Sequence, residues 1–240
     1  EKGREPQYDG YVESFTENWE KLEQYDNNAP KTMNAHLHVL EAYTLLYQCW
    51  KDNGLKKRLE FCVDLFMNRI YDPSRKHFNL FFDNEWNSLV EMDSYGHDVE
   101  TGWLLCEAAR TLENQDLIEQ TNQLALDVTE ACLAEGMSDK GYMIYEKKGD
   151  RKTKHASWWG QIETVIACVN AWQISGSDVY LQSVDTVWTF VKDHMVDKEY
   201  GEWYSDCFDG EPKKEAPKVS MWRCPYHTVR LGVEMYNRLK

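Results

Sequence analysis

The sequence predicts an all-α protein built from helical hairpins arranged as an α/α toroid. Three observations lead to this: four strongly apolar helical segments, amphipathic segments between them, and a short aromatic segment ahead of each apolar one. A helix that is apolar on most of its circumference is surrounded by protein, whereas a helix with charges on one side faces solvent. The repeated order of outer helix, aromatic loop and inner helix therefore predicts two concentric rings of helices.

The helical segments are bounded by turn residues such as Pro73, Gly136 and Gly176. Inner helices are predicted at 34–50, 97–113, 158–174 and 225–239. Outer helices are predicted at 55–70, 115–134 and 178–195. Aromatic segments with alternating polar residues, which we interpret as short β-hairpin loops, lie at 8–20, 77–93, 141–150 and 201–212.

Residue spacing supports a repeat of about 60 residues. His97 follows His38 by 97 − 38 = 59 positions, Glu163 follows Glu100 by 163 − 100 = 63, and His227 follows Glu163 by 227 − 163 = 64. This period fits a two-helix hairpin with a decorated loop. A ring of six such hairpins needs roughly 360 residues, and this chain holds about four. We therefore expect an incomplete toroid.

The length of 240 residues predicts a single domain, residues 1–240, that lacks the N-terminal hairpins of a closed ring. The first residues contain neither an initiator Met nor an apolar signal region, so we expect either that the chain begins inside a longer protein or that its start was removed. Seven cysteines without C-x-x-C spacing predict reduced, mostly buried thiols and a cytoplasmic location.

Composition also excludes classes of partner. A net charge of −14 argues against nucleic acid, because phosphate binding needs a basic surface. No apolar run of about 18 residues occurs, so no membrane span is expected. An open ring would expose apolar flanks of its inner helices. We therefore expect a monomer or a weak homo-oligomer.

Polar and aromatic residues gather near the first turns of the predicted inner helices. His97 and Glu100 are i, i+3 and share one helix face, and Trp103 continues it. Any one of these residues alone is better explained as a satisfied core residue. Four helix starts that face one cavity would instead define a site. The other members of this predicted site are Asn34, His38, Trp159, Glu163, Trp222 and His227.

Aromatic rings mixed with His and Glu around a cavity favour a carbohydrate ligand. Removal of a proton beside a sugar aldehyde needs a base whose pKa lies near the working pH, and histidine meets this need. A metal site is the alternative, because His and Glu are zinc and iron ligands. No H-E-x-x-H motif, close His pair, G-x-S-x-G or Gly-rich phosphate loop occurs, so we expect no metal and no cofactor.

Four ordered motifs resemble the cellobiose 2-epimerase branch of the N-acylglucosamine 2-epimerase family, along the chain from about Tyr11 to its end. They are MNAHLHVLEAYT (33–44), SYGHDVE (94–100), WWGQIE (158–163) and WRCPYH (222–227). The resemblance implies an (α/α)6 barrel and an isomerase. The implied reaction is epimerisation at C2 of the reducing-end sugar of a β-1,4-linked disaccharide, through a cis-enediolate, without metal or nucleotide.

The resemblance also implies roles for residues. His97 and His227 match the paired acid/base residues, and Glu100 and Glu163 match the carboxylates that orient them. The residues that match sugar-binding positions are Asn34, His38, Trp103, Trp159 and Trp222.

The sequence departs from the family pattern in two places. Thr228 stands where Asn is usual after the CPYH motif, although Arg230 is retained. The first hairpins of the family, which supply an arginine and a tyrosine to the cavity, have no counterpart, so this chain would hold the acid/base pair without the whole site.

Two other functions stay open at this point. An α/α-barrel glycoside hydrolase or lyase could use Glu100 and Glu163 as its two carboxylates. A non-catalytic sugar-binding module is the other, because hairpins are missing.

Overall fold

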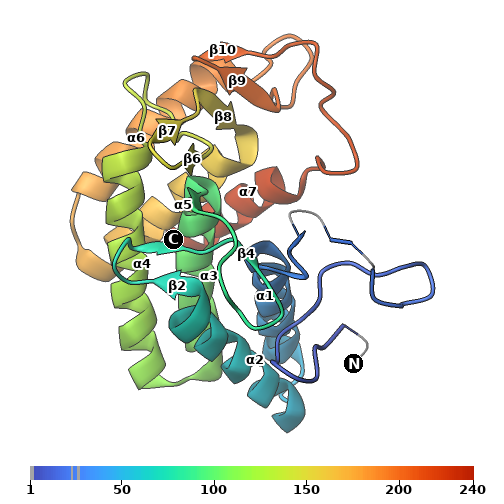
Figure 1. Ribbon diagram of the computed structural model, residues 1–240. Helices are drawn as coiled ribbons and strands as arrows, with labels where there is room; N and C mark the ends of the chain where they lie inside the picture. The colour runs from blue at the N-terminus through green and yellow to red at the C-terminus, as the bar shows by residue number, and fades with distance from the viewer. Residues whose placement is uncertain (1–2, 23, 26–27) are drawn as a thin grey trace. The chain divides into compact units, whose positions relative to one another are not determined.

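The computed structural model describes residues 3–22, 24–25 and 28–240, and most of its regular structure is helical (Figure 1). Seven α-helices lie in this part of the chain: α1 Met33–Cys49, α2 Asn53–Leu65, α3 Tyr95–Leu112, α4 Gln115–Gly136, α5 Trp158–Ser175, α6 Val179–Phe190 and α7 Tyr226–Arg238. All inner and outer helices that the sequence predicts are present. Their ends differ from the predicted ones by a few residues.

The chain forms two compact units. The first contains Glu1–Asp93 with Leu104–Thr121, and the second contains Ser94–Trp103 with Asn122–Lys240. A single domain over residues 1–240 stays a prediction.

Hydrogen-bonded caps fix where two inner helices begin. The hydroxyl of Thr32 accepts the Ala35 N–H at 3.1 Å at the start of α1. The hydroxyl of Ser157 accepts the Gly160 N–H at 3.2 Å at the start of α5. Each cap satisfies a backbone donor that has no partner inside the helix. At the other end, Gly176 closes α5 in the left-handed conformation, with φ at 71°.

Two outer helices end in a π-helical turn that the sequence analysis did not predict. Helix α2 continues into Phe66–Ile70, and α6 continues into Val191–Met195. In both, the residue after the turn donates its N–H to the carbonyl of the first residue of the turn. Such a turn holds one more residue than an α-helical turn, so hydrophobic periodicity cannot distinguish it from the end of an α-helix.

The loops ahead of the inner helices contain short antiparallel strand pairs. In the first unit, strand β1 Lys31–Thr32 pairs with β4 Phe81–Phe82, and β2 Tyr71–Asp72 pairs with β3 His77–Phe78. The first unit also contains β5 Met92–Asp93. In the second unit, the pairs are β6 Lys147–Lys148 with β7 Arg151–Lys152, β8 His155–Ser157 with β9 Asp206–Phe208, and β9 with β10 Glu211–Pro212.

The predicted hairpin at 8–20 does not form as a strand pair. Its residues instead make single bridges, Arg4 with Tyr11 and Phe15 with Lys21.

Helix α5 is the central element of the second unit, and it packs against α6 and α7 (Figure 1). Every residue from 160 to 171 is buried. Its C-terminal half joins a core of Cys168, Ala171 and Tyr180, against which Leu126, Leu133, Trp172 and Val184 pack. Because the whole circumference of α5 is covered, any polar side chain on it needs a partner inside the protein.

Most of the cysteines are buried, as predicted: five of the seven have buried side chains. Burial raises the pKa of the Cys168 thiol to about 12, which keeps it protonated and inert. Within the described residues, no helix has both the length and the hydropathy that crossing a membrane requires.

Candidate active site

Three helix starts in the second unit bring together six of the residues of interest. The N-terminal part of α3 carries His97 and Glu100, α5 carries Trp159 and Glu163, and α7 carries His227 and Arg230. In each pair the residues are three or four positions apart, so both side chains lie on one face of their helix. The sequence analysis predicted five of these six residues as site residues. Arg230 is the addition.

The indole of Trp159 contacts both predicted acid/base histidines. Its ring centroid lies 4.6 Å from that of His97 and 5.8 Å from that of His227. Gly96 makes this approach sterically feasible, because a Cβ there would lie 2.7 Å from Trp159 Cζ3. The structure therefore places the two histidines around one indole, although they are 130 positions apart in the sequence (227 − 97).

A buried carboxylate orients His227. Its Nδ1 lies 2.7 Å from Oε1 of Glu163, whose side chain has no exposed surface. A carboxylate accepts hydrogen bonds, so Nδ1 is the protonated nitrogen and the neutral ring carries its lone pair on Nε2. His97 differs, because its Nδ1 lies 2.8 Å from the Ser94 hydroxyl, which can donate or accept. The carboxylate of Glu163 thus fixes the tautomer of His227.

Arg230 joins the two carboxylates. Its Nη1 donates to Glu100 Oε1 at 2.6 Å and to Glu163 Oε1 at 3.1 Å, and all three side chains are buried. The indole N–H of Trp103 donates to Glu163 Oε2 at 2.9 Å. Glu163 therefore accepts from three side chains, which offsets the cost of burying its charge. The spacing of Arg230, three residues after His227, was the sequence signal for its place on this face.

A metal ion is the competing occupant of this cluster. Ligand atoms of Glu100, Glu163 and His227 all lie within 4.8 Å of one another. Arg230 already supplies a positive charge to both carboxylates, and a divalent cation beside its guanidinium would be repelled. The donor set therefore fits a guanidinium better than a metal.

Three predicted site residues lie elsewhere in the chain. Asn34 and His38 lie on α1 in the first unit, where His38 is exposed and its Nδ1 lies 3.6 Å from Glu41. Trp222 precedes α7 and is 83% exposed. The functional roles of all three stay predictions.

Trp158 was not predicted, and its ring lies 6.1 Å from His227, edge to face. The WW pair at the start of α5 was the available signal.

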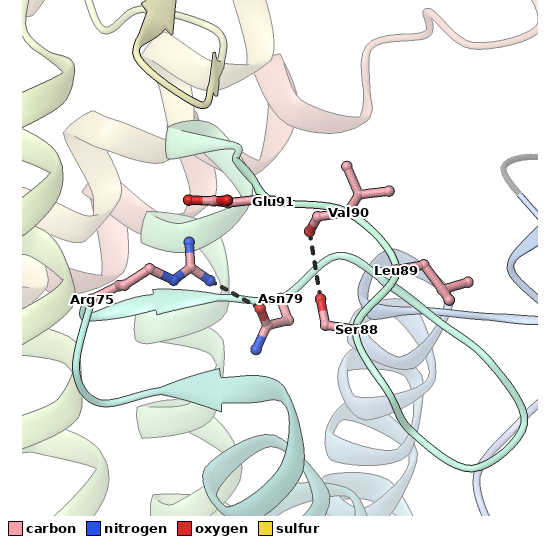
Figure 2. Close-up of a pocket in the computed structure, with 6 residues that line it drawn as sticks. All are labelled: Arg75, Asn79, Ser88, Leu89, Val90 and Glu91. Atoms are coloured by element: carbon pink, nitrogen blue, oxygen red, sulfur yellow. Dashed lines mark hydrogen bonds between the residues drawn. The ribbon is translucent and has the colours of Figure 1, made fainter.

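Each unit also has a cavity whose lining includes none of these residues. The cavity of the first unit measures about 260 Å³. Figure 2 shows the residues that line it, which are Arg75, Asn79, Ser88, Leu89, Val90 and Glu91. Arg75 donates there to Asp72, Asp93 and Asn79, so its charge is matched by structural partners.

The cavity of the second unit measures about 460 Å³ and is mostly apolar, lined by Val165, Val184, Trp188, Trp203, Thr228, Leu231, Gly232 and Met235. Neither lining contains a predicted site residue.

A profile of the N-acylglucosamine 2-epimerase (GlcNAc 2-epimerase) family matches residues 1–230. The chain belongs to this family. Two curated members are cellobiose 2-epimerases. The one from Bacteroides fragilis is 40% identical over 94% of this chain and 59% of its own length, and the one from Dictyoglomus turgidum is 36% identical over 96% and 60%. The chain thus spans about three fifths of these 2-epimerase family members.

Solved structures agree with this assignment. Cellobiose 2-epimerase from Bacillus thermoamylovorans superimposes with a TM-score of 0.94 at 34% identity, covering 99% of this chain and 62% of that one. A D-mannose isomerase at 18% identity, with a TM-score of 0.77 over 95% of this chain and 58% of that one, shows likeness of fold alone. The expected mostly helical fold and family membership are confirmed.

Proposed function

We propose that this chain carries the acid/base apparatus of a carbohydrate 2-epimerase that acts on the reducing-end sugar of a β-1,4-linked disaccharide such as cellobiose. The observation that carries the proposal is that His97 and His227 border one indole, with His227 oriented by Glu163. Two imidazoles beside one sugar carbon can act as base and acid. The names of the 36–40% identical relatives support cellobiose as substrate.

The reaction begins with the open-chain sugar. One histidine takes the proton from C2, and the C–H electron pair forms the C1=C2 double bond of a cis-enediolate as charge moves to O1. The other histidine, as imidazolium, then delivers a proton to the opposite face of C2, and the C1 carbonyl re-forms. The first imidazole gains the proton that the second loses, and exchange with solvent restores the pair. His97 and His227 exchange roles when the reaction runs backwards.

The remaining residues hold this pair in place. Glu163 keeps Nδ1 of His227 protonated, and Arg230 offsets the charge of Glu163 and Glu100. Trp159 offers its indole to the apolar face of the sugar ring, a contact that aromatic side chains make well. The other sugar-binding positions in the proposal are Asn34, His38, Trp103 and Trp222.

We infer an incomplete (α/α)6 barrel formed as a single domain, in a monomer or weak homo-oligomer in the cytoplasm, with no metal or cofactor. Seven cysteines without C-x-x-C spacing support the cytoplasmic location. Because the chain spans about 60% of its relatives, the activity of the whole protein belongs to the proposal.

A glycoside hydrolase is less well supported. Hydrolysis needs two carboxylates that flank the scissile bond. Glu100 and Glu163 instead share one guanidinium nitrogen, Arg230 Nη1, in a buried cluster. A non-catalytic sugar-binding unit is the second candidate, because the Trp159 indole beside His97 and His227 could also bind a sugar without reacting with it.

The test is incubation with cellobiose in heavy water. Deuterium at C2 and formation of the glucosyl-mannose epimer are expected, and both should be lost in His97→Asn and His227→Asn. His194→Asn is the control, because His194 is a partly buried histidine of the same unit that stacks on Phe190 instead. Absence of C2 deuterium with this chain and with a longer protein containing it would refute the proposal. Calorimetric binding without exchange would favour the sugar-binding unit, and release of monosaccharide the hydrolase.

A further inference from the structure

Trp159 is confined by a third aromatic residue besides the two histidines. The ring of Tyr145, from the loop ahead of α5, lies 6.0 Å from that of Trp159 and nearly perpendicular to it, at 84°. On another side, the backbone at Gly96 leaves no room for even a methyl group. The indole therefore has little freedom to move relative to the histidines as long as Tyr145 stays where it is.

Tyr145 is itself the end of a stack of three rings. Its ring lies 4.7 Å from that of His155, and His155 stacks on Phe208 at 4.8 Å with only 10° between the planes. The strand register explains the stack, because His155 of β8 lies directly opposite Phe208 of β9. Directly opposed side chains in an antiparallel pair lie on the same face of the sheet. The Tyr145 N–H also donates to the His155 carbonyl at 2.8 Å.

Asp206 holds the middle ring of this stack. Its Oδ1 lies 2.6 Å from His155 Nε2, and both side chains are partly exposed. Asp206 is two residues from Phe208 on β9, so it projects from the same face as the rings. Burial acts to raise the pKa of Asp206, but hydrogen bonds from His155 and Ser205 hold it below its usual range. The aspartate is therefore a charged acceptor that prevents His155 from turning.

The same strand pair fixes the start of α5. Ser157 is both the last residue of β8 and the cap of α5, and the Trp158 N–H donates to the Ser205 carbonyl at 2.9 Å. Trp159 is the second residue of that helix. The strand pair thus controls the backbone of Trp159, while the ring stack built on the strand pair controls its side chain.

We propose that Tyr145, His155 and Asp206 are positioning residues that hold the Trp159 indole against His97 and His227. None of them needs to touch the substrate, since each acts through the next ring. The effect on catalysis rests on the proposed function, whereas the effect on the two histidines does not. A displacement of a catalytic group by about 1 Å can lower the rate roughly 100-fold. The three positioning residues would therefore matter for the proposed reaction.

The direct test is the NMR shift of the imidazole Hε1 protons of His97 and His227, assigned by their Asn variants. The Trp159 ring current displaces both signals. Tyr145→Leu and His155→Leu should move both shifts towards those of Trp159→Leu, whereas Tyr145→Phe, which keeps the ring, should leave them in place. Unmoved His97 and His227 signals in the folded Tyr145→Leu and His155→Leu proteins would overturn the proposal.

His194→Leu is the matched control for His155→Leu. Both histidines are partly buried in the second unit and stack on a phenylalanine at 4.8 Å. Circular dichroism identifies any variant that fails to fold. Asp206→Asn is a milder substitution that can replace His155→Leu if that variant does not fold. Asp206→Asn should move the two signals less than His155→Leu, in the same direction. If Asp206→Asn leaves the His97 and His227 signals in place, Asp206 is not a positioning residue.

Exchange kinetics give the catalytic consequence. Tyr145→Leu and His155→Leu should lower kcat for deuterium uptake at C2 by roughly tenfold or more while changing KM little, because the positions of the acid and base are altered. Equal kcat values in His155→Leu and His194→Leu would overturn the claim that these residues affect catalysis through Trp159. If the unaltered protein shows no deuterium exchange at C2, the proposed function fails. The NMR shifts still decide whether Tyr145, His155 and Asp206 position Trp159.

Discussion

His227 Nδ1 lies 2.7 Å from Oε1 of Glu163, a carboxylate with no exposed surface. The two residues are 64 positions apart (227 − 163) and come from neighbouring helices, α5 and α7. The bond sets the tautomer of the imidazole and matches a buried negative charge with a proton donor. It links the stability of the second unit to the chemistry proposed for it.

Glu163→Gln tests the orienting role. The amide of Gln can turn its NH₂ towards His227 and favour the wrong tautomer. An orienting carboxylate is worth up to roughly 10⁴-fold in serine hydrolases, so we expect deuterium uptake at C2 to fall by at least about 100-fold. Glu130→Gln is the control, because Glu130 accepts a hydrogen bond from Tyr180 instead. Equal loss in both variants would contradict a specific role for Glu163.

Arg230→Met tests the charge balance. It leaves Glu100 and Glu163 buried without their shared cation, and breaking such a pair costs about 3–5 kcal/mol. Urea unfolding followed by circular dichroism measures the loss. Arg110→Met on α3 is the comparison variant, because the Arg110 side chain is 37% exposed and pairs with the partly exposed Glu107, and a loss of about 1 kcal/mol or less is expected. A smaller loss in Arg230→Met than in Arg110→Met would refute this account.

Gly96→Ala tests the close approach of Trp159. Alanine normally favours a helix over glycine by about 1 kcal/mol. Here its Cβ would meet the indole at 2.7 Å, and overpacking costs about 1–3 kcal/mol. We expect lower stability, moved His97 and His227 NMR signals and slower exchange. Gly232→Ala on α7, whose Cβ would meet nothing within 4 Å, should be stabilising. Stabilisation by both substitutions would contradict the packing described.

His36 gives the first unit a pH dependence. It is buried, its Nδ1–H donates to the Thr32 carbonyl at 2.7 Å, and its Nε2 accepts the Tyr11 N–H at 2.9 Å. Burial lowers the pKa of His36 from 6.5 to about 4. Between pH 6.5 and pH 4, His36 is therefore protonated in the unfolded chain and neutral in the folded one. Its stabilising contribution is complete above pH 6.5 and is lost as pH falls towards 4, by about 3 kcal/mol.

Unfolding by urea at a series of pH values measures this loss. His36→Gln, which cannot titrate, should show a shallower decline in stability between pH 6.5 and 4. His38→Gln is the control, because His38 is an exposed histidine on the same helix. A decline as steep in His36→Gln as in the unaltered protein would assign the pH dependence to other groups.

The elements that the sequence predicted well are those whose signal is local. Inner helices such as α5 were evident from continuous apolar segments, and Gly176 lies directly after the helix that it ends. The π-helical turn Phe66–Ile70 was missed because its composition is that of an α-helix. The hairpin expected at 8–20 forms only single bridges, since alternating aromatic residues do not specify a pairing partner.

The sequence by itself determined the helical repeat, the family and the identity of His97, His227, Glu100 and Glu163 as candidate site residues. Only the tertiary structure decided what these side chains contact. It bonded Arg230 to two buried carboxylates and brought Trp159 into contact with two histidines, and it joined His155 to that indole through Tyr145. The physical reason is that periodicity fixes which face of a helix a residue occupies, whereas contacts between helices depend on packing among residues far apart in the chain.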